Sequence, residues 1–348
     1  MSPPTDVVDT GEFDRTPRVT RKRRSKRPPG AIAQVILFLS VWGTVVPILG
    51  MAAAWPTLTA AVEQSGMVGP DGRLSPDLDA DRLNALLTAS SGTTLAVAAA
   101  TAVGTVVAVW IMVRFFQGPS LLDLGLRPRP GWIADSAIGL VLGPIMFLAI
   151  LLVLLVAGWA RTEAGTIGVQ GLSTAFVTYV LVAFSEEVFA RGWVLQVLER
   201  GRGTWVAAIG SAAIFSLLHA FNPGFDLTAL LGLFLAGLLF AQAYIVTRQL
   251  WLPIALHLTW NFSEGPLFGF PVSGMASEGL MTVHPTGPEV VTGGPFGPEA
   301  GLVVIVGIAI AAAALYALGQ WRAARATTAP NTTPSRQRSA VSSELLAE

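Results

Sequence analysis

Two adjacent carboxylates and an arginine interrupt an apolar stretch of the sequence, LVAFSEEVFARGW at residues 181–193. Glu187 and Arg191 are four residues apart, so on a helix they share a face and can neutralise each other. Glu186 is turned about 100° from Glu187 around the helix axis and lacks that partner. The spacing therefore predicts a structural role for Glu187 and Arg191 and a chemical role for Glu186.

Further polar groups within apolar stretches include His219, His257 and Asn261, and His219 follows Phe215 at the same four-residue spacing that separates His257 from Asn261. A carboxylate can act as general base toward water, and imidazoles can hold that water, donate to an oxyanion or bind a metal. An asparagine amide can also donate to an oxyanion. These side chains together suit the hydrolysis of an amide or ester. The remaining histidine, His284, lies in an expected loop and is interpreted as incidental.

The same buried charges also suit two other kinds of protein, a structural polar network between helices and a transporter with a Glu186–His219 proton or ion relay. Pro253 offers one broken helix of the kind that transporters use, but no matching broken helix is evident in the other half of the chain. Cysteine is absent, and the G-x-S-x-G, P-loop and G-x-G-x-x-G motifs are not found.

The elements that would position these side chains are transmembrane helices. The chain is 52% hydrophobic and only 13% charged, and its mean hydropathy is +0.60. A soluble domain averages about 25% charged residues. We therefore predict an all-α, polytopic membrane helix bundle of about eight spans around a polar intramembrane cavity. The expected spans are 31–55, 91–113, 132–159, 172–199, 204–220, 227–246, 250–263 and 300–318.

Two of these spans are short for a bilayer, which takes about 20 helical residues. The run at 204–220 is slightly short and the run at 250–263 is clearly short, so the sequence does not show whether 250–263 crosses fully. At 1.5 Å per residue, Glu186, His219, His257 and Asn261 would still lie within about 10 Å of one another in depth. That agreement permits one common site.

The distribution of basic residues predicts the topology. The segment RTPRVTRKRRSKRPPG at residues 15–30 places eight basic residues before the first span. With eight spans, 18 basic residues fall on the side of this tail and three on the other, and Arg191 lies within a span. Because basic residues mark the cytoplasmic side, both termini are expected in the cytoplasm.

The sequence divides into five regions. The loop 56–90 is acidic, and its segment DLDADRLNALL could form a short amphipathic helix, whereas the loop 264–299 is rich in Gly and Pro and is expected to be irregular. The predicted regions are a basic disordered tail at 1–30, N-terminal transmembrane helices at 31–171, a catalytic core at 172–263, an outer loop with the last helix at 264–322, and a disordered tail at 323–348.

Three short motifs resemble those of one known family. EEVFAR at 186–191 is similar to the E-E-x-x-x-R motif of the CAAX-processing and bacteriocin-immunity intramembrane proteases, the CPBP or Abi-type family. FSLLH at 215–219 is similar to its F-x-x-x-H motif, and HLTWN at 257–261 to its H-x-x-x-N/D motif. The motifs occur in the family's order, each on its own expected helix, and the resemblance covers about residues 172–263.

The resemblance implies a membrane-embedded peptidase. Glu186 would activate water, His219 would hold or polarise it, His257 and Asn261 would stabilise the oxyanion, and Glu187 and Arg191 would support the geometry with Phe215. The family has been described both as glutamic and as metallopeptidases. Glu186, His219 and His257 are the ligands if a divalent metal such as zinc is bound, whereas a glutamate–water mechanism requires none.

The expected setting is a bacterial plasma membrane, because arginine, alanine and glycine dominate over lysine in the manner of a GC-rich coding bias. The expected partners are a peptide or membrane-protein substrate and the lipid bilayer, with no nucleic acid. A catalytically silent immunity or scaffold protein of the same fold is the alternative to an active peptidase. The physiological substrate, the metal dependence and the oligomeric state do not follow from the sequence.

Overall fold

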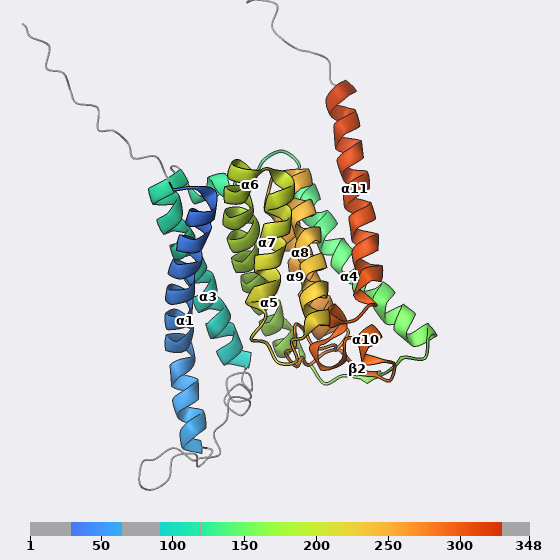
Figure 1. Cartoon of the computed structure of the whole chain (residues 1–348). Coiled ribbons are helices and arrows are strands. Elements are labelled where there is room, and N and C mark those ends of the chain that lie inside the picture. The colour runs from blue at the N-terminus through green and yellow to red at the C-terminus, as the bar shows by residue number, and fades with distance from the viewer. Residues whose placement is uncertain (1–28, 65–90, 118–119, 329–348) are drawn as a thin grey trace, which may run out of the picture.

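The computed structural model describes residues 29–64, 91–117 and 120–328, and these form an all-α bundle with one small sheet (Figure 1). The expected basic tail and the expected amphipathic helix of the acidic loop lie outside the described residues. The long elements are α1 (Ala31–Gln64), α3 (Ser91–Met112), α4 (Trp132–Val156), α5 (Val169–Glu187), α6 (Gln196–Arg202), α7 (Thr204–Leu218), α8 (Leu227–Thr247), α9 (Trp251–Phe262) and α11 (Val304–Thr328).

Six helices of the described chain are long and apolar enough to cross a membrane, so the protein is a multi-pass membrane protein. They are Ala31–Thr57, Gly92–Phe116, Trp132–Val156, Val169–Arg202, Leu227–Thr247 and Val304–Arg325. The spans expected at 204–220 and 250–263 form the shorter helices α7, of 15 residues, and α9, of 12 residues. The number of eight spans therefore stays a prediction.

The ends of the bundle differ from the expected boundaries. Helix α1 continues nine residues beyond the expected end at 55, and α11 continues to Thr328, so the start of the tail expected to be disordered from 323 is helical. The N-terminal end of α1 and the C-terminal end of α11 lie on the side of α6 (Figure 1). The two ends of the described chain therefore lie on one side of the bundle.

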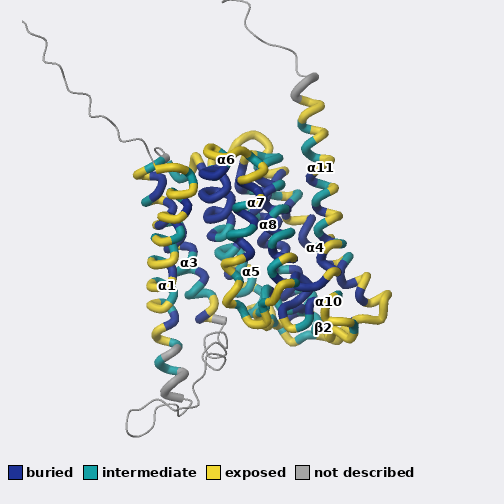
Figure 2. Tube along the Cα trace, in the orientation of Figure 1, coloured by how far each residue is buried: buried dark blue, intermediate teal, exposed yellow. Residues whose placement is uncertain are grey.

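Among the α-helices, buried residues are most frequent in α8 and α9, whereas α1 and α11 expose much of their length (Figure 2). Small residues allow the core helices to approach closely. A Cβ on Gly143 of α4 would overlap the hydroxyl of Thr259 on α9, and that hydroxyl donates to the carbonyl of Gly139 at 2.9 Å. A Cβ on Gly237 of α8 would lie 2.9 Å from the Cα of Ala212 on α7. As in other membrane bundles, glycine brings the helices that carry the site into contact.

The face opposite α6 carries more structure than the Gly- and Pro-rich sequence indicated. Strand β1 (Ala160–Ala164) pairs antiparallel with β2 (Met281–Pro285), with Thr162 opposite Val283. We call the side of the molecule that carries these two paired strands, opposite α6, the hairpin face. The loop expected to be irregular also contains α10 (Glu289–Thr292) and the 3₁₀ turns η5 (Gly294–Phe296) and η6 (Pro298–Ala300). Pairing between segments about 120 residues apart leaves no local signal in the sequence.

The remaining short helical segments adjoin the long helices. They are the π-helical segments η1 (Val113–Gln117), η3 (Val188–Leu195) and η4 (Ser263–Leu267), and the 3₁₀ turn η2 (Leu121–Leu124). Segment η3 joins α5 to α6 and starts directly after Glu187. Single π turns within α-helices often occur at functional sites. The regular α-helix assumed from the sequence is therefore wrong over residues 188–195.

An ion pair ties α11 to the core. Arg322 on α11 contacts the carboxylate of Asp135, which is fully buried in the first turn of α4. Asp135 is one more carboxylate inside an expected span, and the sequence analysis had not singled it out. A buried charge in a membrane helix needs such a partner. Arg322, one of the basic residues counted toward the expected topology, thus also fixes α11 to α4.

Candidate active site

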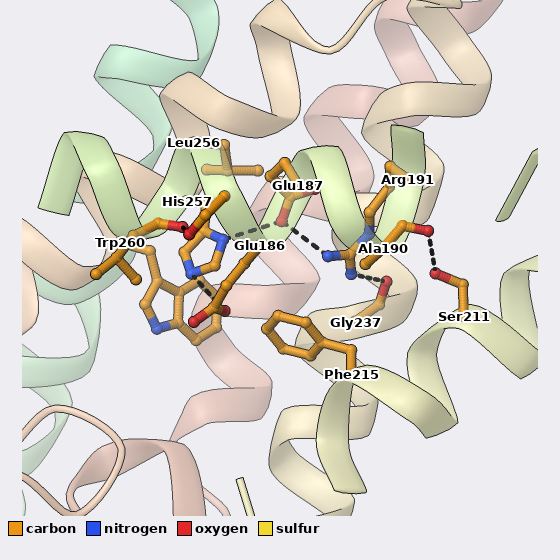
Figure 3. Close-up of polar contacts among 12 residues, drawn as sticks. Glu186, Glu187, Ala190, Arg191, Ser211, Phe215, Gly237, Leu256, His257 and Trp260 are labelled. Atoms are coloured by element: carbon orange, nitrogen blue, oxygen red, sulfur yellow. Dashed lines mark hydrogen bonds and ion pairs between the residues drawn. The ribbon is translucent and has the colours of Figure 1, made fainter. Parts of the chain in front are cut away.

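Glu187 is the centre of a buried network between three helices (Figure 3). Its Oε1 atom lies 2.7 Å from Nη1 of Arg191 and 2.9 Å from Nδ1 of His257. The side chains of Glu187 and Arg191 are both fully buried, and Nη2 of Arg191 donates to the carbonyl of Gly237 at 2.8 Å. The ion pair expected from the four-residue spacing is therefore present, and it connects α5 to α8 and α9.

Two phenylalanine rings enclose the charged network. The guanidinium carbon of Arg191 lies 4.7 Å from the ring centroid of Phe215 and 5.1 Å from that of Phe240. Phe240 also stacks on the imidazole of His257, with the ring centroids 4.7 Å apart and the planes inclined by 15°. Aromatic faces attract a guanidinium, and more so away from water. Phe215, the first residue of the F-x-x-x-H segment, thus supports Arg191.

His257 is held in one orientation by Glu187. Because a carboxylate only accepts, Nδ1 of His257 carries the proton in this 2.9 Å contact. In the neutral ring, Nε2 is then left as an acceptor. Nε2 lies 3.8 Å from Oε2 of Glu186, on the far side of the ring from Glu187.

His219 is oriented in the same way by a backbone carbonyl. Helix α7 ends at Leu218, so His219 lies at the cap of the helix that was expected to contain it. Its Nδ1 lies 2.9 Å from the carbonyl oxygen of Phe215, which can only accept, and so Nδ1 donates. Nε2 of His219 then faces Glu186, 4.0 Å from Oε2.

Glu186 therefore faces Nε2 of two imidazoles, each of which is held through Nδ1. Its side chain is 32% exposed, compared with 0% for Glu187. Its Oε2 atom is buried and has no hydrogen-bond partner among the described residues. The separations of 3.8 and 4.0 Å are too long for direct hydrogen bonds. These separations instead leave room for a water molecule that donates to the Glu186 carboxylate and to one of the two imidazoles.

All four residues expected to act in catalysis line one pocket of about 350 Å³. They are Glu186, His219, His257 and Asn261. Asn261 lies one helical turn beyond His257 on α9 and is buried, with 6% of its surface exposed. The pocket also brings in Trp42 of α1 and threonines of α3. The three motifs thus meet in space, as the depth argument permitted.

The types of these donors fit a zinc ion better than their spacing does. One carboxylate and two imidazoles are a known ligand set for catalytic zinc. Ligand atoms about 2.0–2.1 Å from a tetrahedral ion lie roughly 3.3 Å from one another, which is shorter than the separations of 3.8 and 4.0 Å around Glu186. No group of three His, Asp or Glu residues in the described part of the chain is placed to hold a metal ion.

Two further carboxylates lie close to the pocket and were missed by sequence reasoning. Glu299 of η6 lines the pocket and accepts from Nε1 of Trp260 at 2.8 Å and from the hydroxyl of Ser273 at 2.6 Å. Glu264 is fully buried beside it, close enough for the two carboxyl groups to interact. The signal for Glu264 was its position three residues after Asn261.

If both carboxyl groups were ionised, Glu264 and Glu299 would repel each other, and protonation of Glu264 removes this repulsion. Glu264 follows the last turn of α9, just beyond the span expected at 250–263. Burial raises the pKa of Glu264 well above its ordinary range, and the neighbouring Glu299 carboxyl raises it further. The protonated Glu264 can donate to Glu299, which already accepts from Trp260. The pair thereby connects the hairpin face to α9.

A known family model matches the part of the chain that carries the three motifs. Residues 168–263 match the family model described as Rce1-like, type II CAAX prenyl endopeptidase Rce1-like. The match confirms the resemblance seen over residues 172–263, and it contains the three motifs. These residues form a CAAX-protease-like domain within a polytopic helix bundle. No curated protein matches the chain closely enough to be counted as similar.

Proposed function

We propose that the protein is an intramembrane endopeptidase that hydrolyses peptide bonds with a water activated by Glu186. The observation that carries the proposal is the approach of Nε2 of His219 and Nε2 of His257 to one oxygen of Glu186, inside a pocket that also contains Asn261. The Rce1-like match over the same residues supports it independently.

The first step follows from the acceptors around Glu186. A water between them donates one proton to Glu186 and is oriented by His219, and the oxygen then bonds to the carbonyl carbon of the substrate. As the carbonyl oxygen becomes an oxyanion, the amide of Asn261 donates to it. Because its proton is on Nδ1, toward Glu187, His257 accepts at Nε2 and helps His219 to position the water, which leaves Asn261 as the donor to the oxyanion.

The second step breaks the bond between the carbonyl carbon and the amide nitrogen. Glu186, now protonated, gives its proton to the leaving nitrogen, so the products are a carboxyl group and an amine. Glu187, Arg191 and Phe215 do not touch the reacting atoms in this scheme. They hold His257 and His219 in place, as their contacts indicate.

The test compares the wild type with Glu186→Gln in detergent on a peptide library. We expect the variant to lose cleavage by roughly 10²–10⁴-fold, the usual contribution of a general base. Its melting temperature should be unchanged, because Glu186 is partly exposed and makes no ion pair shorter than 3.8 Å among the described residues. Glu163→Gln is the matched control, since Glu163 is exposed on β1. Equal cleavage by wild type and Glu186→Gln would remove Glu186 from the mechanism, and a wild type that cleaves nothing would favour the silent scaffold.

A further inference from the structure

The pocket at Glu186 continues toward the hairpin face. A second cavity, of about 290 Å³, shares Thr94, Thr178 and Tyr179 with the pocket that contains Glu186. Its other lining residues lie nearer the hairpin face, at Ile167, Gly171, Thr174, Ala175, Ala276, Ser277 and Glu278. The two cavities adjoin at these shared residues, between α3 and α5, and together we call them the passage.

Hydroxyl groups follow this passage on both helices. On α3, Thr94, Thr101 and Thr105 are separated by seven and four residues, so they lie on one face of the helix. On α5, Thr178 and Ser185 are seven residues apart and also line the pocket. Each hydroxyl can donate and accept hydrogen bonds. Polar groups at membrane depth are tolerated where they line a water-filled cavity.

The length of the passage suits a short extended segment of polypeptide. Thr174, near the hairpin face, and Glu186 are twelve residues apart on α5, which is roughly 18 Å along the helix. An extended chain advances about 3.3 Å per residue, so about five residues span that distance. A folded domain does not fit such a passage, whereas an extended segment can pair its backbone with the threonine hydroxyls.

The charge of the passage limits which polypeptide segments can enter it. Its carboxylates are Glu186, Glu299 and Glu278, and the two cavities include no lysine or arginine among the described lining residues. An acidic substrate segment would find no cation there, and like charges repel it. Uncharged and basic segments are not repelled in this way.

We propose that an extended, non-acidic polypeptide segment reaches Glu186 from the hairpin face through the passage between α3 and α5, with water following the same route. The substrate part of this inference rests on the proposed peptidase function, and the water route does not. By the distribution of basic residues, the hairpin face is the side opposite the cytoplasm.

The water route is tested by the reactivity of introduced thiols, which requires no enzymatic activity. The chain has no cysteine, so a single introduced cysteine is its only thiol. Thr178→Cys is placed in the passage, Glu278→Cys at its exposed mouth, and Ala183→Cys at a fully buried position of α5 outside both cavities.

A membrane-impermeant maleimide is added to oriented vesicles that contain one of the three variants. We expect it to modify the Glu278→Cys and Thr178→Cys variants from the same side and to leave the Ala183→Cys variant unmodified. Modification of the Thr178→Cys variant only from the other side, or from neither, would overturn the route.

The substrate part is tested by filling the passage. Thr178→Phe places a ring in it, whereas Val177→Phe, its neighbour on α5, faces outward at 46% exposure. We expect Thr178→Phe to lower kcat/KM for peptide cleavage by about tenfold or more and Val177→Phe to leave it unchanged. Should Thr178→Phe fail to fold, Thr174→Phe fills the second cavity instead.

Peptide length and charge give a second readout. Peptides with fewer than about five residues on one side of the cleaved bond should lose kcat/KM, as should peptides with Asp or Glu in that stretch. Full cleavage by Thr178→Phe and Thr174→Phe, with no dependence on length, would overturn the substrate route while the peptidase function stood. A wild type that cleaves nothing, while the thiol of the Thr178→Cys variant reacts from the hairpin face, would reject the peptidase function and leave the water route in place.

Discussion

One oxygen of Glu187 contacts both Nδ1 of His257, at 2.9 Å, and Nη1 of Arg191, at 2.7 Å. The same carboxylate thus neutralises a buried cation and fixes which nitrogen of His257 faces Glu186. A single residue connects the stability of the bundle to the chemistry of the pocket. The sequence spacing indicated only the first of these two roles.

Replacement of Glu187 should therefore affect stability and activity together. Glu187→Gln leaves Arg191 buried without a counter-ion, which costs about 3–5 kcal/mol of unfolding free energy. It also weakens the orientation of His257, and loss of such a supporting contact lowers activity by about 10–100-fold. The double variant Glu187→Gln with Arg191→Met should regain much of the melting temperature and none of the cleavage. Recovery of both would show that Glu187 acts on stability alone.

Phe215 should contribute through Arg191 and His219. Phe215→Leu keeps an apolar side chain and removes the aromatic face 4.7 Å from the guanidinium carbon. A cation–π contact away from water is worth about 2 kcal/mol, so we expect a lower midpoint of thermal unfolding and reduced cleavage. Phe225→Leu is the matched control, because Phe225 contacts Phe296 near the hairpin face. The prediction is wrong if both variants unfold at the same temperature with the same cleavage.

Gly143 should be intolerant of any side chain. Gly143→Val would press against Thr259 on α9, the helix that carries His257 and Asn261. Overpacking costs about 1–3 kcal/mol, and displacement of α9 should lower cleavage as well. Gly43→Ala is the control, since nothing lies within 4 Å of a Cβ at that helical position. Equal melting temperatures for Gly143→Val and Gly43→Ala would contradict the close packing of α4 against α9.

The pH dependence of stability should report on Glu264. Its pKa is raised in the folded protein above the ordinary value of about 4.3, so the folded state keeps a proton that the unfolded state releases. Stability then declines as the pH rises above that ordinary value toward the raised pKa. Glu264→Gln has no such proton to lose, and its melting temperature should fall less than that of the wild type as the pH is raised above about 5. Parallel profiles for both proteins would show that Glu264 does not keep its proton.

Removal of metal should leave cleavage intact. The acceptor atoms around Glu186 are 3.8 and 4.0 Å from its Oε2, wider than a tetrahedral zinc site requires. We expect activity to survive dialysis against a chelator and added Zn²⁺ to bring no gain. Activity that is lost with the chelator and restored by Zn²⁺ would instead assign Glu186, His219 and His257 as metal ligands.

The sequence predicted those features that depend on neighbours along one helix. The Glu187–Arg191 pair and the Phe215–His219 contact both follow from a spacing of four residues. The all-α bundle followed from the long apolar runs, because most of them are long enough to form a helix across a bilayer. That three motifs meet in one pocket was expected from the family resemblance and from depth.

The remaining features arise from contacts between distant segments. Glu264 and Glu299 are far apart along the chain, and β1 pairs with β2 across the intervening helices α5 to α9. No periodicity in either segment indicates its partner. The role of Glu187 toward His257 was missed for the same reason, since the direction of a side chain depends on how α9 packs on α5. Arg322 was read only as a sign of topology, although it contacts the buried Asp135.

The π-helical turn after Glu187 makes the site sensitive to the number of residues in the chain. A π turn holds about one residue more than an α turn, so deletion of one residue within η3 would let α5 and α6 join as a continuous α-helix. Because the π turn already takes up the additional residue, the faces of α5 and α6 would stay roughly in register. The change would be confined to the turn itself, where deletion of a residue between Glu187 and Arg191 would reduce their separation from four residues to three. The Glu187–Arg191 contact, and through it the orientation of His257, therefore depends on the length of this turn as well as on the identity of its residues.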